Sequence, residues 1–152
     1  VHLESGRVKL IATGARPQGA VLSRDGKLLY VTCSDGNSIS IIDTGKNEPV
    51  GVIPTGKGPG RVALTPDGAT LVYNLQPGEA VGFADIASRR ETKVVPLGGR
   101  PLSLTLSADG RRAYAGVQDQ DKVFVVSVPE GKIVQVIATP KGSGPDPALP
   151  LP

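Results

Sequence analysis

One sequence pattern occurs three times in this chain, each copy 42 residues after the one before. The dipeptide Asp-Gly recurs at that interval, and a glycine and a proline ahead of it keep step. The recurring positions are Gly14, Gly56, Gly98, Pro17, Pro59, Pro101, Asp25, Gly26, Asp67, Gly68, Asp109 and Gly110. An apolar run precedes each Asp-Gly and a tyrosine-bearing run follows it, as in AVLSRDGKLLYV (20–31). Short apolar runs joined in this way predict a β-hairpin in every copy.

The turn residues have a local physical cause. An aspartate side chain accepts hydrogen bonds from the turn backbone, and the glycine that follows adopts the positive φ that closes the hairpin loop. We therefore assign structural turn roles to Asp25, Gly26, Asp67, Gly68, Asp109 and Gly110. Asp43 and Asp85, also one period apart, are expected to accept backbone N–H groups at the end of a third strand, and Ser127 to do so more weakly.

A period in the low forties built from short strands is typical of β-propeller blades. Helical repeats of similar length would not carry 20 glycines and 14 prolines, which disfavour helix. The sequence thus predicts an all-β fold, a β-propeller arc of about three complete four-stranded antiparallel blades plus one leading strand. The alternative of a WD-repeat propeller requires tryptophan and a Gly-His pair, and the chain has no tryptophan.

The repeat places the strands of each blade. We expect propeller repeats over residues 1–147, with blades near 18–55, 60–96 and 102–138 and the leading strand at 7–13. A proline-rich C-terminal tail is expected at 148–152, because four prolines in the last eight residues cannot continue a central strand. The expected strands are 18–23, 28–33, 37–43, 49–55, 60–65, 70–75, 80–85, 91–96, 102–107, 112–117, 122–128 and 132–138.

Three blades are fewer than the four to eight that close a typical propeller. An open arc leaves one sheet face uncovered at each end, so we expect a protein partner or missing blades of the same propeller to cover these faces. The leading strand exposes Val8, Leu10 and Ile11. The isolated chain is therefore expected to self-associate.

Composition narrows the partner classes. The formal charge is +3 with scattered basic residues, and phenylalanine and tyrosine total five, so neither a basic stripe nor stacking platforms for nucleic acid are present. No apolar stretch approaches the length of a membrane helix. The single cysteine, Cys33, excludes an intramolecular disulfide, and its repeat equivalents Leu75 and Val117 indicate a buried core position.

The pattern G-x-x-P, an apolar run, S/T/A-x-D-G and then Tyr30-Val31-Thr32-Cys33 resembles the YVTN family of bacterial β-propeller repeats. The second and third copies depart from it, with Val72-Tyr73-Asn74 and Tyr114-Ala115-Gly116. The resemblance, over residues 7–147, implies a bacterial protein of the periplasm, cell surface or secreted fraction whose repeats form a rigid scaffold. Propellers of the same broad architecture include lactonases, amine dehydrogenase heavy chains and haem d1 oxidoreductases.

The sequence gives little support for an enzymatic function. The only histidine is His2, near the terminus, so no catalytic, cofactor-binding or metal site is predicted and no cofactor is expected. No G-x-S-x-G elbow is present, and TGKGPG (55–60) lacks the ending of a phosphate loop.

One constellation of charge remains. The loops that enter the innermost strands carry cations that would gather at one mouth of the central channel. These are Arg16, Lys57, Arg61, Arg100 and Lys141. Asp35, Glu79, Asp119 and Asp121 reach the same end and would partly cancel this field. The favoured interpretation is a solvated mixed surface, and the alternative is a shallow site for an anionic ligand or partner.

The sequence therefore favours a non-catalytic binding or structural scaffold. The rival hypothesis is a piece of a propeller enzyme whose catalytic residues lie in N-terminal blades missing from these residues.

Overall fold

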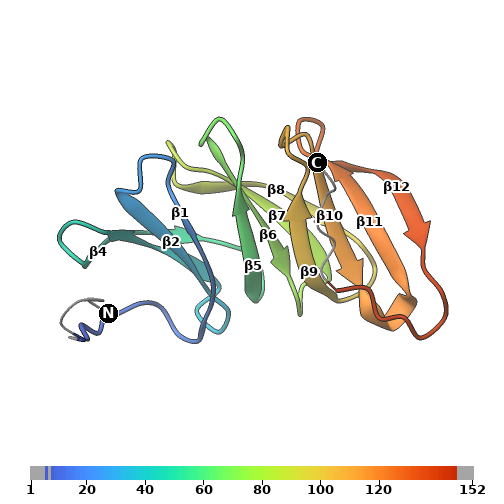
Figure 1. Ribbon diagram of the computed structural model, residues 1–152, viewed down its shortest axis with the longest axis horizontal. Helices are drawn as coiled ribbons and strands as arrows, with labels where there is room; N and C mark the ends of the chain where they lie inside the picture. The colour runs from blue at the N-terminus through green and yellow to red at the C-terminus, as the bar shows by residue number, and fades with distance from the viewer. Residues whose placement is uncertain (1–5, 7, 147–152) are drawn as a thin grey trace.

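The computed structural model describes residue 6 and residues 8–146, and these form three four-stranded antiparallel sheets side by side in an arc (Figure 1). This confirms the predicted all-β blades. Blade one holds β1 (Pro17–Leu22), β2 (Leu28–Cys33), β3 (Ser38–Asp43) and β4 (Glu48–Pro54). Blade two holds β5 (Pro59–Leu64), β6 (Thr70–Leu75), β7 (Ala80–Asp85) and β8 (Arg90–Pro96). Blade three holds β9 (Pro101–Leu106), β10 (Arg112–Val117), the 3-10 turn η1 (Gln118–Gln120), β11 (Lys122–Ser127) and β12 (Lys132–Ala138).

Every strand lies within one residue of the range that the repeat gives it. Within each sheet the strand order follows the chain, so every neighbouring pair is a hairpin. Among the described residues, no helix is long or apolar enough to cross a membrane.

The Asp-Gly turns share one hydrogen-bond pattern. In blade one, Asp25 Oδ1 accepts bonds from the Ser23 hydroxyl at 2.7 Å and the Lys27 backbone N–H at 3.1 Å. Asp67 and Asp109 accept the equivalent pairs of bonds in blades two and three. The three turn glycines have φ values of 69°, 74° and 69°, which side-chain-bearing residues rarely adopt.

The turns between the third and fourth strands also repeat. Asp43 Oδ1 accepts the backbone N–H groups of Gly45 and Lys46 at 2.9 and 2.8 Å. Asp85 accepts that of Ser88 at 2.7 Å. Ser127 takes the place of these carboxylates in blade three, where its hydroxyl accepts the Glu130 N–H at 3.4 Å.

The hydrophobic core lies between blades. We call the face of a blade that points toward the next blade its trailing face, and the opposite face its leading face. The first interface joins the trailing face of blade one (Tyr30, Ile39, Ile41, Ile53) to the leading face of blade two (Leu71, Tyr73, Leu75, Ala84). The second joins the trailing face of blade two (Val72, Val81, Phe83, Val95) to the leading face of blade three (Ala113, Ala115, Val117, Val126).

The predicted leading strand is wrong for residues 8–13, which form no strand; residue 7 lies outside the described residues. A strand requires a neighbour for its backbone hydrogen bonds, and the described chain offers none there. The segment crosses the leading face of blade one, where Ile11 packs against the cluster of Val31, Cys33 and Ile42. Cys33 is fully buried in that cluster, as its apolar repeat equivalents indicate. The predicted tail at 148–152 also lies outside the described residues.

Candidate functional site at one end of the arc

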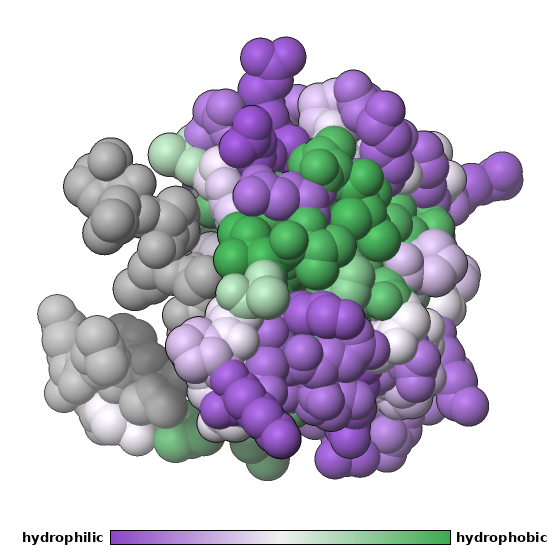
Figure 2. All heavy atoms as spheres, turned by 90° about the vertical axis from the view of Figure 1, so that its right-hand side faces the viewer, coloured by the Kyte–Doolittle hydropathy of each residue, from purple (hydrophilic) through white to green (hydrophobic). Residues whose placement is uncertain are grey.

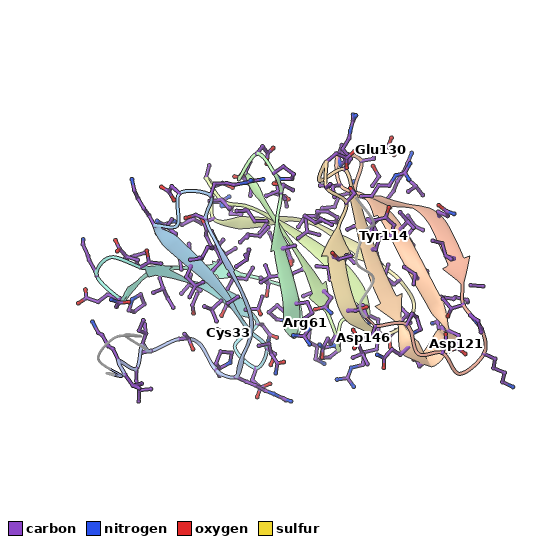
Figure 3. The ribbon with its side chains drawn as sticks, in the orientation of Figure 1. Cys33, Arg61, Tyr114, Asp121, Glu130 and Asp146 are labelled. Atoms are coloured by element: carbon purple, nitrogen blue, oxygen red, sulfur yellow. The ribbon has the colours of Figure 1, made fainter. Side chains whose placement is uncertain are left out.

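Alternate turns of an up-and-down sheet lie at the same end, so all three blades contribute loops to one edge of the arc. We call this edge the connector end, because it holds the three connections into the innermost strands (Figure 1). Its segments are 14–16, 34–37, 55–58, 76–79, 97–100, 118–121 and 139–146. Figure 3 places Arg61, Asp121 and Asp146 at this end and Glu130 at the other.

The five cations singled out in the sequence are exposed at or next to this end. Arg16 has a left-handed φ of 55° and forms an ion pair with Asp35 at 3.6 Å. The Arg100 guanidinium donates to Gln76 Oε1 at 3.4 Å, across blades two and three. Lys57 and Lys141 lie in connectors, and Arg61 lies in β5. The structure therefore spreads these side chains along the arc, one or two for each blade.

The acidic side chains of the connector end are partly engaged. Asp35 faces Arg16, and Asp121 accepts the backbone N–H groups of Gly142 and Gly144 at 2.8 and 3.3 Å. These hydrogen bonds, Gly142 first, hold the pKa of Asp121 below its usual value. A depression of about 560 Å³ opens beside Asp121 and includes Arg100 and Asp119. A cation and a carboxylate thus share this hollow.

Two buried polar residues, Thr32 and Asn74, were not singled out as functional in the sequence. Asn74 Oδ1 accepts the Arg61 N–H at 2.6 Å, and its amide donates to the Pro101 carbonyl at 2.9 Å. Thr32 accepts the Gly19 N–H at 2.9 Å and donates to the Gly60 carbonyl. Each side chain therefore joins the innermost strand of its own blade to that of the next. The sequence signal for these two residues is a polar side chain inside an apolar strand that recurs after 42 positions.

A second, partly buried hydrogen-bond network joins blades one and two. The Tyr73 hydroxyl donates to Glu91 Oε1 at 2.6 Å, and the same oxygen accepts the Gly56 N–H at 2.9 Å. Burial, followed by the hydrogen bond to Glu91, raises the pKa of Tyr73 far above its usual value. The tyrosine therefore stays a neutral donor, and the carboxylate secures the connector between the two blades.

Thr32 of blade one and Asn74 of blade two have a glycine, Gly116, as their repeat equivalent in blade three. A Cβ there would lie 2.4 Å from the carbonyl oxygen of Pro145. Gly58-Pro59-Gly60 and Gly144-Pro145-Asp146 correspond once two inserted residues are allowed for. The Pro145 carbonyl thus occupies the place that the carbonyls of Gly60 and Pro101 hold against blades one and two.

The opposite end of the arc has a depression of about 610 Å³ between blades two and three, lined in part by Asp67, Asp109, Lys93 and Arg111. Both aspartates belong to the repeated turns described above. Within residue 6 and residues 8–146, no three side chains of His, Cys, Asp or Glu are grouped as a metal site requires.

Comparisons with known proteins give the fold. No family model matches the chain, and no curated protein matches it. Among solved structures, hydrazine synthase of Kuenenia stuttgartiensis matches with a TM-score of 0.78 at 25% identity, over 90% of this chain and 39% of that one. Dihydro-heme d1 dehydrogenase NirN matches at 0.72 and 15% identity, over 88% and 30%. The WD40 repeats of RRP9 match at 0.73 and 16% identity, over 86% and 41%.

The chain therefore spans less than half the length of each of these three structures. The neighbours include both enzymes and a WD40 repeat protein, and they share its arrangement of four-stranded antiparallel blades. The chain therefore has the fold of consecutive β-propeller blades, as the 42-residue repeat, the three sheets and these neighbours show.

Proposed function

We propose that this chain is a non-catalytic binding or structural scaffold of the YVTN type, acting in the bacterial periplasm or at the cell surface. The observation that carries the proposal is the use made of its polar side chains. The aspartates of the repeated turns, Thr32, Asn74 and the Tyr73–Glu91 pair all hold backbone in place. They serve rigidity, which a scaffold requires, rather than a reacting centre.

The connector end is the binding surface in this proposal. Lys57, Arg61, Arg100 and Lys141 are exposed there, while Asp121 is held by the chain's own backbone. Such a surface suits an acidic partner, because lysine ammonium and arginine guanidinium groups bind carboxylates. This attraction weakens as the salt concentration rises. The partner class we propose is a protein segment rich in aspartate and glutamate.

A labelled poly-glutamate peptide tests this surface by fluorescence anisotropy. We expect binding at low salt that weakens as ionic strength passes about 0.15 M, where the screening length is near 8 Å. The double variant Arg61→Glu with Arg100→Glu should lower the affinity about tenfold or more, since each reversal replaces attraction with repulsion.

The matched control is Arg24→Glu with Arg111→Glu, which makes the same change in net charge at the opposite end. These two arginines are exposed beside the Asp-Gly turns. If both double variants bind the peptide equally well, the connector end is not the binding surface.

The second candidate function is a part of a propeller enzyme. Two of the structural neighbours, hydrazine synthase and NirN, have enzyme names, which supports this reading. Sequencing the gene on both sides of the region that encodes these 152 residues separates the two functions. Further blades with His, Glu and Asp clustered at the channel would favour the enzyme, and blades without them would favour the scaffold.

A further inference from the structure

Within residue 6 and residues 8–146, no blade covers the trailing face of blade three. Figure 2 shows a band of hydrophobic side chains across this end of the arc. Its strand β12 exposes Val134 and Ile137 by 47% and 39%. Tyr114 and Val123 of β10 and β11 lie half-buried beside them.

The repeat identifies what such a face contacts when it is covered. Tyr114, Val123, Val125 and Ile137 follow the trailing-face residues Tyr30, Ile39, Ile41 and Ile53 by 84 positions, which is two periods. Ile53 and its blade-two equivalent Val95 are 0% and 6% exposed, because a leading face covers them. Ile137 is the same position without its cover.

At the other end of the chain, the leading face of blade one is covered in part by residues 8–14, and among the described residues no blade packs against it. Blade one presents Leu22, which is 51% exposed. Its equivalents Leu64 and Leu106 pack against the two inter-blade clusters. The two end faces of the molecule are therefore the two halves of an interface that the arc already contains twice.

We propose that the trailing face of blade three binds the leading face of blade one in a second copy of this chain, head to tail. The contact continues the series of inter-blade interfaces. Two copies then bring together six blades, which is within the four to eight of closed propellers. This contact lies on the end faces, apart from the connector-end surface of the proposed function.

Residues 8–14 compete for the same position. Ile11 precedes Ile53 by one period and packs on the leading face as an outer strand of a preceding blade would. The Gly14 N–H donates to the Ser40 hydroxyl at 3.0 Å and holds the segment there. In the head-to-tail contact, Ile137 of one copy takes the place of Ile11 in the other.

Sedimentation velocity on the full chain over a range of micromolar concentrations tests the proposal. We expect a reversible species of at least twice the 15.6 kDa monomer mass. Ile137→Glu should weaken association about tenfold or more, because it places a charge within an apolar contact. Val136→Glu is the matched control, since Val136 neighbours it on the opposite face of β12 with 47% exposure.

Mixing two variants tests the orientation. Leu22→Glu spoils the leading face and Ile137→Glu the trailing face, so each variant alone should stay monomeric. An equimolar mixture should form heterodimers, because it contains one intact face of each kind.

Three results would overturn the proposal. The first is a wild-type chain that stays monomeric at every concentration. The second is equal association of the Ile137→Glu and Val136→Glu variants. The third is a Leu22→Glu protein that still associates alone, which would indicate two trailing faces packed against each other. Circular dichroism on each variant checks that it remains folded.

Discussion

At the scale of single residues, two turn glycines with the same backbone have different surroundings. Gly26 and Gly110 both have a φ of 69°, so a side chain at either is strained. A Cβ on Gly26 would meet nothing within 4 Å, whereas one on Gly110 would lie 2.1 Å from the ring of Pro66. The backbone cost is thus common to both positions, and the steric cost belongs to one.

We expect Gly26→Ala to lower the free energy of unfolding by about 1–2 kcal/mol, from the left-handed backbone alone. Gly110→Ala should cost clearly more, because the Pro66 ring in blade two must also move. Urea unfolding followed by circular dichroism measures both. Equal midpoints for the two variants would show that the ring contact does not strain the native state.

At the scale of strands, the 42-residue repeat predicts every strand of the three sheets, because hairpins depend on local turn chemistry and alternation. Residues 8–13 are the exception, since their sequence suits a strand but strand formation needs a neighbour. The cations of the connector end were also placed from the repeat. The repeat does not predict that Asp121 accepts hydrogen bonds from Gly142 and Gly144, because these bonds arise from a two-residue insertion in segment 139–146.

Asn74 joins the innermost strands β5 and β9. Asn74→Ala should cost roughly 2–4 kcal/mol, since two hydrogen bonds are lost in a fully buried place. Asn74→Thr should recover part of this loss, as Thr32 makes the equivalent contacts in blade one. Thermal or urea unfolding decides; a threonine variant no more stable than the alanine one would contradict the bridging role.

For the whole molecule, the repeated carboxylates make stability depend on pH. Hydrogen bonds from Ser23, Thr65, Ser88 and Ser107 lower the pKa of Asp25, Asp67, Asp85 and Asp109, and those from Gly142 and Gly144 lower that of Asp121. The folded chain therefore binds fewer protons than the unfolded chain, in which the pKa of aspartate is about 3.9. The stability that these aspartates contribute is complete above the unfolded pKa. It is lost as the pH falls through their lower pKa values in the folded chain.

Urea midpoints should accordingly stay level from about pH 7 to 5 and fall below about pH 4. Asp109→Asn removes one titrating turn and should make the acid decline shallower while lowering the plateau. Asp119→Asn, on an exposed residue of η1, is the control and should leave the profile unchanged. An acid decline of equal steepness in all three proteins would contradict the assignment of pH dependence to the turns.

Each blade contacts a backbone carbonyl of the chain segment that follows it, that of Gly60, Pro101 or Pro145. These contacts can form early during synthesis. On a ribosome adding about 5–20 residues per second, each 42-residue unit takes roughly 2–8 s to emerge. The innermost strand of a new unit emerges first and can dock at once on the finished blade, through a carbonyl such as that of Gly60 or Pro101. The outer strands of the new unit, which complete the apolar interface, emerge last. The trailing face of the finished blade therefore stays partly exposed for seconds after its polar contact with the next innermost strand has formed.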